Sequence, residues 1–383
     1  MSIQLHLHQP GNIFRLLATT ISGLESLTKY EIQDRGQNLL RTEDRSLLFE
    51  TDLRWVYQSL ISSRYSNRIY LVAGEFEWVS DFDELYRVIS LVDWQSLLPQ
   101  DHPIIIDATS ITSELSSIPS IQRVATKALH EQITLRPQYG RDEIHIELLL
   151  KKNRLSILLD ITWEALHKRG YRKESGEAPL KETLAAALVT LSGYRGNTSF
   201  YDYFAGSGTI AIEAAMIARR IAPGLFRWFR IISLPWHDEQ MLDEVLDKAE
   251  STILPIDQCK NGDKPIKIYA SDSDASMQAI ALSNARRALV TDMIEWRTWS
   301  FETLSVDDLS LGQPLHWVSN PPYGDRMELS DDLRWALIDF LKHPLTRGGI
   351  IMADEHIHEE LRRISFKNRK FNQGGMNAYF YSK

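Results

Sequence analysis

The chain of 383 residues carries 51 acidic and 43 basic side chains, a formal net charge of −8, which disfavours a protein that coats nucleic acid without specificity. Its length predicts two or three domains. The single cysteine, Cys259, excludes an intrachain disulfide and any cysteine-rich zinc or iron–sulfur site, and it suits a reducing, cytoplasmic compartment. No secretion signal opens the sequence, and no apolar stretch approaches the roughly 20 residues that cross a bilayer, so we expect no membrane span.

The first 160 residues are predicted to form two α+β units. The first has strands over 14–20, 46–50 and 69–73 and helices that begin at 24 and at 53; the second has helices over 82–92 and 119–132, a strand over 103–108 and a hairpin of 144–150 with 155–160. Neither unit contains paired acids or a cluster of metal ligands. Binding or positioning is therefore their expected role.

Gly, Ser and Pro concentrate between residues 161 and 180, as at a domain boundary. Beyond residue 198 strands alternate with helices, and a segment over 223–264 interrupts them as an insertion above the sheet edge. This alternation predicts a doubly wound, mainly parallel α/β sheet, in which ligands bind at the carboxyl ends of the strands. The residues expected at those ends are Asp202, Asp272, Ser300 and Asn320.

A glycine loop follows the strand that ends at Asp202 and comprises Ala205, Gly206, Ser207, Gly208 and Thr209. Glycine permits the tight turn into a helix and lets a ligand approach the backbone amides at the helix start. The full dinucleotide pattern of three glycines is absent, which disfavours a nicotinamide-dependent oxidoreductase. A cofactor loop and an ordinary tight turn both remain open from this motif alone.

Asp272 ends the next strand of this sheet, where a carboxylate can bind ribose hydroxyls. Asp274 has two interpretations, a second cofactor contact or the N-cap of the following helix. Glu213, on the helix after the glycine loop, faces either a cofactor ammonium or solvent.

Asn320-Pro321-Pro322-Tyr323 is the most specific motif in the sequence. The prolines fix the backbone, so that the Asn320 side-chain oxygen and the Pro321 carbonyl can both accept hydrogen bonds from one amine. The amine lone pair then points at a methyl donor, which is catalysis by positioning. Tyr323 can stack on the base that carries the amine. Together with the glycine loop, this motif predicts methyl transfer from S-adenosylmethionine to an exocyclic nitrogen of a base.

The sequence resembles the THUMP-domain class I RNA methyltransferases that act on guanine N2, particularly the bacterial 23S rRNA enzymes. The matching segments are 17–25, 166–172 with 178–187, 206–209 with 212–215, and 320–324 with Arg326. The resemblance implies a ferredoxin-like region over 1–75, a THUMP RNA-binding domain over 76–165 and a Rossmann-like methyltransferase domain over 166–383. The family's motifs also suggest RNA contacts at Lys168, Arg169, Arg172, Lys181 and Arg326.

Two departures from the family pattern stand out. Ser300 takes the place of an Asp near the cofactor adenine, and Tyr203-Phe204-Ala205 replaces a Pro-x-Cys sequence. One methyltransferase domain rather than two predicts a single modification. The open alternatives are tRNA as substrate, adenine N6 as the target nitrogen, and a noncatalytic RNA-binding or ribosome-assembly protein.

Overall fold

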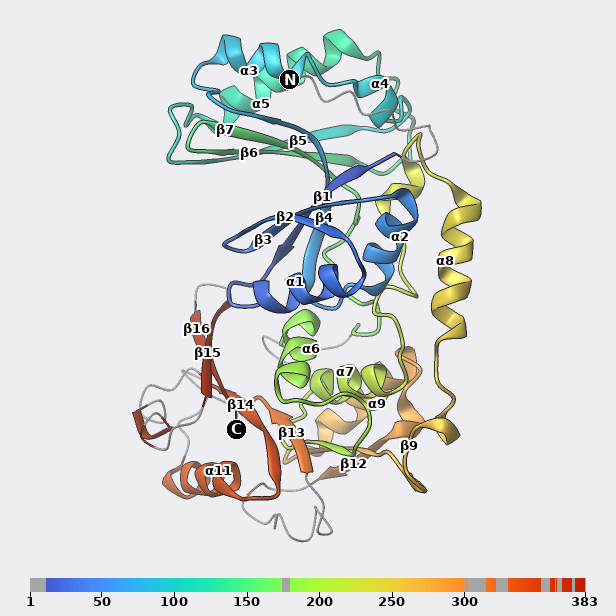
Figure 1. Ribbon diagram of the computed structural model, residues 1–383, viewed down its shortest axis with the longest axis vertical. Helices are drawn as coiled ribbons and strands as arrows, with labels where there is room; N and C mark the ends of the chain where they lie inside the picture. Colours follow the sequence, from blue (N-terminus) through green and yellow to red (C-terminus); the bar gives the residue numbers. More distant parts are fainter. Residues whose placement is uncertain are drawn as a thin grey trace.

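A computed structural model of the chain describes residues 12–173, 180–298, 301, 315–321, 330–352, 359–361, 363, 367–373 and 376–382. These residues form two large mixed sheets, one in each half of the chain, stacked along the long axis of the molecule (Figure 1). Within them, no helix is both long and apolar enough to cross a membrane.

The N-terminal sheet joins the two expected α+β units into one. Its order is β2-β3-β1-β4-β7-β6-β5, with β4 paired to both β1 and β7. The strands are β1 (Phe14–Thr20), β2 (Asn38–Glu43), β3 (Ser46–Thr51), β4 (Ser66–Phe76), β5 (Ile104–Ile111), β6 (Ile144–Lys151) and β7 (Arg154–Asp160). The helices are α1 (Glu25–Asp34), α2 (Leu53–Ser62), α3 (Phe82–Ile89), α4 (Trp94–Leu97) and α5 (Ile118–Gln132). The division expected at residues 75 and 76 falls at the end of β4 and stays a prediction.

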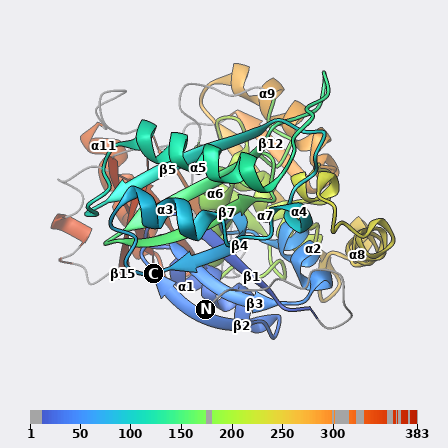
Figure 2. The same ribbon diagram turned by 90° about the horizontal axis from the view of Figure 1, so that it is seen from above.

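Strict alternation shapes the β6–β7 hairpin. Buried and half-buried residues alternate along β6, and its buried face packs beneath α3 and α5, which cover the sheet from above (Figure 2). Lys152 and Asn153 both have positive φ, 52° and 60°. Turns with two positive φ values match the right-handed twist of the paired strands, which explains why the chain reverses where the sequence predicts.

The C-terminal sheet is the doubly wound sheet predicted from the alternation. Its order is β12-β11-β8-β13-β14-β16-β15, parallel from β12 to β14 and antiparallel at the last two strands. The strands are β8 (Phe200–Asp202), β11 (Ile268–Asp272), β12 (Ile294–Thr298), β13 (Leu315–Ser319), β14 (Thr346–Met352), β15 (Lys367–Gln373) and β16 (Met376–Ser382). The helices are α6 (Glu182–Leu191), α7 (Thr209–Ala218), α9 (Ala275–Arg287) and α11 (Asp331–Lys342).

The insertion was expected above the edge of this sheet, but its residues 225–249 pack against the N-terminal half instead. Its helix, α8 (Glu239–Ser251), runs beside α2 of the N-terminal half in both views (Figures 1 and 2). Apolar side chains of the insertion are buried in the N-terminal core: Leu225, Phe229, Ile231, Leu234, Trp236, Val245 and Ala249. These apolar positions explain the misplacement, because a sequence shows that they are buried but not against what.

Candidate functional site

The glycine loop turns between β8 and α7, and its two glycines have different surroundings. Both have positive φ, 48° at Gly206 and 84° at Gly208. A Cβ on Gly208 would lie 2.6 Å from the Trp296 ring and 3.1 Å from Ala281, whereas a Cβ on Gly206 would meet no atom within 4 Å. Gly208 is thus required for packing, and Gly206 borders open space that a ligand can enter.

Asp272, at the end of β11, holds the loop in place. Its Oδ2 accepts a hydrogen bond from the Gly206 amide at 2.8 Å, and its Oδ1 accepts one from the Asp274 amide at 2.9 Å. Asp274 caps α9 by accepting from the Ser276 amide at 2.8 Å. Of its two interpretations, the N-cap is the one for which the structure supplies a contact.

Asp202 ends β8 and is fully buried. Burial raises the pKa of this carboxyl to about 8, although hydrogen bonds from Ser319 and from nearby backbone amides oppose the rise. The Ser319 hydroxyl donates to Asp202 Oδ1 at 3.2 Å and accepts from the Tyr203 amide at 2.7 Å. Ser319 therefore ties the end of β13 to the glycine loop, a role that sequence reasoning missed.

A small pocket opens beside the loop, at the carboxyl ends of β8, β11 and β12. Its lining residues are Ala205, Gly206, Asp272, Asp274, Gln278, Trp296, Arg297 and Thr298. The last four were not anticipated. The sequence predicts the end of this strand at Ser300, whereas β12 ends two residues earlier, at Thr298. The parallel register sets Thr298 directly opposite Asp272, so a strand predicted with the right register would have indicated this residue.

Asn320 and Pro321 follow β13 directly. The side-chain oxygen of Asn320 is buried and has no hydrogen-bond partner among the described residues, and Pro321 is buried beside it. β13 pairs with β8, so Asn320 emerges next to the glycine loop. The predicted contacts at Ser300, Pro322, Tyr323 and Arg326 lie outside the described residues.

Four of the residues expected to contact RNA surround one histidine at the join between the halves. Burial, followed by the charges of Lys181, Arg169, Arg172 and Lys168, lowers the pKa of His167 to about 4. The structure thus brings these four cations together at one place. Their surroundings nevertheless differ widely.

Arg169 requires a correction, because only 4% of it is exposed. Its guanidinium donates to the carbonyl oxygens of Ser63, Leu166 and Arg64, so no surface remains for RNA. Arg172 is largely occupied by Glu182, at 2.8 Å. Lys168 is exposed but pairs with Glu164 at 2.8 Å, and Lys181 is half-buried.

Glu213 fits neither of its sequence interpretations. It is fully buried on α7 and accepts a hydrogen bond from the Tyr171 hydroxyl at 3.1 Å. Arg169 Nε lies 3.6 Å and Arg64 Nη1 3.9 Å from its carboxylate oxygens. Glu213 thus faces the N-terminal half rather than solvent or a cofactor.

The described residues contain no cluster of three or more side chains suited to hold a metal ion. The site instead offers backbone amides, carboxylate oxygens and open space beside Gly206, at the carboxyl ends of parallel strands. This donor set fits a nucleoside-like cofactor better than a bare anion, since Asp272 and Asp274 would repel an anion.

A model of RMKL-like methyltransferase domains matches residues 169–370, and a model of the RlmL ferredoxin-like domain matches residues 15–70. The chain belongs to the RMKL-like methyltransferase family. It is therefore a class I methyltransferase, and S-adenosylmethionine is its methyl donor. At this level the expected fold, reaction class and cofactor are confirmed.

Individual members of the family match over nearly the whole chain. YpsC of Bacillus subtilis strain 168, provisionally named an RNA methyltransferase, is 32% identical over 96% of this chain and 95% of its own length. SMU.472, provisionally named a methyltransferase and solved in complex with SAH, is 30% identical, with a TM-score of 0.84 and 97% of both chains covered. A protein of Listeria monocytogenes strain 4b F2365, described as a predicted N6-adenine-specific DNA methylase, is 29% identical, with a TM-score of 0.83 and coverage of 97% and 96%.

Proposed function

We propose that this methyltransferase modifies the exocyclic N2 amine of a guanine in RNA, with 23S rRNA as the preferred target. The observation that carries the proposal is the buried side-chain oxygen of Asn320, which has no partner among the described residues. A buried acceptor without a donor is destabilising. An amine entering beside the glycine loop would supply that donor.

The chain's contribution to the reaction is positioning. Asn320 Oδ1 and the Pro321 carbonyl would accept the two N–H groups of the amine, which leaves the nitrogen lone pair pointing towards the pocket. When bound, S-adenosylmethionine supplies a sulfonium methyl group; the new N–C bond forms as the C–S bond breaks, and a thioether remains. Neither Asn320 nor Pro321 is a base, so the proton released from the nitrogen passes to solvent. Pro322 and Tyr323 complete the proposed pocket, with Tyr323 stacked on the base.

The cofactor would lie along the glycine loop. Asp272 holds the loop through Gly206 and retains acceptor capacity for ribose hydroxyls. Open space beside Gly206 admits the ligand to the backbone. The proposed cofactor contacts are Asp202, Ala205, Gly206, Ser207, Gly208, Thr209, Asp272, Asp274, Ser300 and Asn320.

RNA as the substrate is supported by the similarity to YpsC. We assign the RNA grip to residues 76–165, with further contacts from Lys168, Arg172, Lys181 and Arg326; Arg169 is excluded by its burial. The Listeria protein is described as an N6-adenine-specific methylase, which supports adenine N6 as a second candidate. The guanine N2 and adenine N6 amines each present two N–H groups, so the same acceptors could bind either. tRNA is the alternative RNA.

In the deciding experiment, the purified protein and labelled S-adenosylmethionine are incubated with protein-free rRNA and, separately, with tRNA, both from a strain that lacks the gene. The nucleosides of each pool are then analysed. We expect N2-methylguanosine from the rRNA pool. The same product from tRNA moves the substrate, and N6-methyladenosine overturns the choice of base. Asn320→Ala is the matched variant, and methylation at the wild-type rate by this variant refutes the mechanism.

A further inference from the structure

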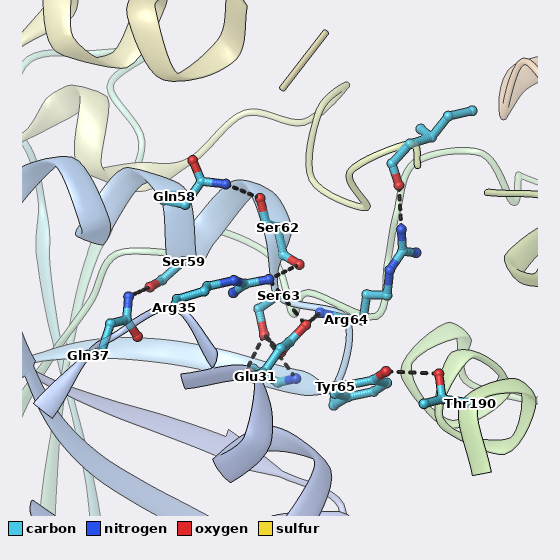
Figure 3. A network of polar contacts seen from close by, with 12 residues as sticks. Glu31, Arg35, Gln37, Gln58, Ser59, Ser62, Ser63, Arg64, Tyr65 and Thr190 are labelled. Carbon is cyan, nitrogen blue, oxygen red and sulfur yellow. Dashed lines mark hydrogen bonds and ion pairs between the residues drawn. The ribbon is translucent and has the colours of Figure 1, made fainter. Parts of the chain in front are cut away.

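A buried polar junction joins the N-terminal half to the helix that starts at the glycine loop. Figure 3 shows its N-terminal side, around Glu31 and Arg64. Arg64 lies between α2 and β4, and its amide donates to Glu31 Oε1 at 2.8 Å. Its guanidinium leaves the N-terminal half and donates to the Ile221 carbonyl at 2.7 Å, just after α7. The same group lies 3.9 Å from Glu213 on α7. Arg64 therefore contacts the N-terminal half through its backbone and the region of α7 through its side chain.

Glu213 is the shared acceptor of this junction. It lies one turn into α7, the helix whose N-cap is Gly208, and it is fully buried. Arg64 and Arg169 approach its two oxygens, and Tyr171 donates to one of them. Its removal would leave two buried guanidinium groups without their counter-charge, which is strongly unfavourable.

A second contact area follows directly along the chain. The Gly224 amide donates to the Ile61 carbonyl at 2.7 Å, and a Cβ on Gly224 would lie 2.7 Å from the Leu60 carbonyl oxygen. The Tyr57 hydroxyl then accepts from the Asp238 amide at 2.7 Å. Gly224 and Asp238 are thus hydrogen-bonded to α2, and apolar side chains between 225 and 249 are buried in the N-terminal core.

A third contact area joins β15, an edge strand of the C-terminal sheet, to the N-terminal half. A Cβ on Gly23 would lie 2.5 Å from the Lys370 carbonyl oxygen on β15, and Ile21 and Leu24 are buried in the C-terminal core. The Tyr65 hydroxyl is 2.8 Å from that of Thr190 on α6 (Figure 3). Contacts at three separated areas resist rotation about any single hinge.

We propose that Arg64, Glu213 and the segment 221–251 are positioning elements that hold the N-terminal half at one fixed orientation to the methyl-transfer site. The inference rests on the proposed function, since an RNA gripped by the N-terminal half must also reach Asn320. RNA bound at one end would then present a single nucleotide to the amine pocket. The insertion, for which the sequence suggests no role, acquires one here.

The junction is tested first without substrate. Spin labels at Asp83→Cys and Asp292→Cys, both exposed, report the distance between the two halves by pulsed electron resonance, and the native cysteine is buried. We expect one narrow distance distribution for the wild-type protein and a broadened one for Glu213→Gln. Arg54→Ala is the control, because it removes an exposed ion pair between α2 and α8 and should leave the distribution narrow.

Activity then tests the consequence. Glu213→Gln should lower kcat/KM for 23S rRNA at least tenfold, by raising KM. Its Kd for S-adenosylhomocysteine should stay within twofold of the wild-type value, and so should its rate on the shortest RNA fragment that the wild-type protein methylates. Arg64→Lys, which keeps the charge but loses the fork, gives an independent reading should Glu213→Gln fail to fold. Unchanged distances in both variants overturn the proposal. If wild-type protein methylates no RNA, the proposed function fails, yet the distance measurement still decides the junction.

Discussion

Asp272 is the residue whose contacts bear most directly on cofactor binding, because its two oxygens accept from the Gly206 and Asp274 amides. Asp272→Asn would turn an amide NH2 towards one of these donors. A hydrogen bond to a charged group contributes about 1.5–3 kcal/mol, so S-adenosylmethionine should bind roughly 10- to 100-fold more weakly by calorimetry. Asp274→Asn is the matched comparison: Asn keeps the cap of α9, so this variant should lose less affinity than Asp272→Asn. Equal losses in both variants would contradict this assignment.

Asp202 should make stability depend on pH. Its pKa of about 8 in the folded protein lies above the unfolded value, so between about pH 4 and pH 8 the unfolded chain releases a proton that the folded protein keeps. The free energy of unfolding therefore falls as pH rises through this window, by at most about 1.4 kcal/mol per pH unit. Asp202→Asn resembles the protonated form and removes this contribution, which leaves that of Glu182, whose pKa burial raises to about 7. Urea unfolding of both proteins from pH 4.5 to 8.5 measures it; parallel profiles would refute the raised pKa.

At the residue scale, the sequence predicted the positions of functional side chains better than it predicted which residues contact them. Asp272 lies at the predicted strand end because alternation locates the strand. Glu213 was misread because its partners, Arg64 and Arg169, are 149 and 44 residues away along the chain. The apolar neighbours of Glu213 indicate that α7 is buried. A sequence pattern does not, however, identify the distant arginines that compensate the buried charge of Glu213.

At the element scale, the loop between β8 and α7 separates two uses of glycine. Gly208→Ala combines positive φ with contact against Trp296 and Ala281, and should destabilise the protein by about 1–3 kcal/mol more than Gly206→Ala, the range of overpacking effects. Gly206→Ala should instead weaken S-adenosylmethionine binding more strongly, because its Cβ fills the open space. Thermal unfolding and calorimetry of the two variants test this opposite ranking; the same ranking in both assays would contradict it.

Elements with strong local signals were predicted closely, and those defined by distant pairing were not. The strand expected over 14–20 is β1, and the hairpin turn at Lys152 and Asn153 is where its positive φ values lie. β2 was missed, since no residue along it is buried and its pattern is only a weak alternation. The C-terminal hairpin of β15 and β16 was also missed, because its place in the sheet depends on β14.

At the scale of the whole molecule, the two halves do not have separate cores. The N-terminal core includes side chains from 225–249, and the C-terminal core includes Ile21, Leu24 and Tyr65. The domain limits expected at 75 and 165 describe the order of the sequence units. The hydrophobic cores, in contrast, cross the second limit in both directions.

Because the N-terminal core includes side chains from 225–249, we predict that residues 1–165 will not fold alone. Without the insertion, the surface that receives Trp236, whose ring centroid lies 5.4 Å from that of Phe14, would be exposed together with the sites of Leu225, Phe229 and Val245. Burial of each such side chain contributes about 1.5–3 kcal/mol, and several together approach the 5–15 kcal/mol that stabilises a typical protein. The fragment should therefore show no cooperative thermal transition by circular dichroism.

The complementary fragment 166–383, added in equal amount, should restore the transition by supplying the missing side chains. As a control, the intact chain cleaved between 165 and 166 after folding should remain associated on size exclusion. Cooperative unfolding of 1–165 near the melting temperature of the intact chain would show that the N-terminal core is complete without the insertion. In that event residues 221–251 would cover a finished surface, and the fixed orientation of the two halves would depend on Arg64 and Glu213 alone.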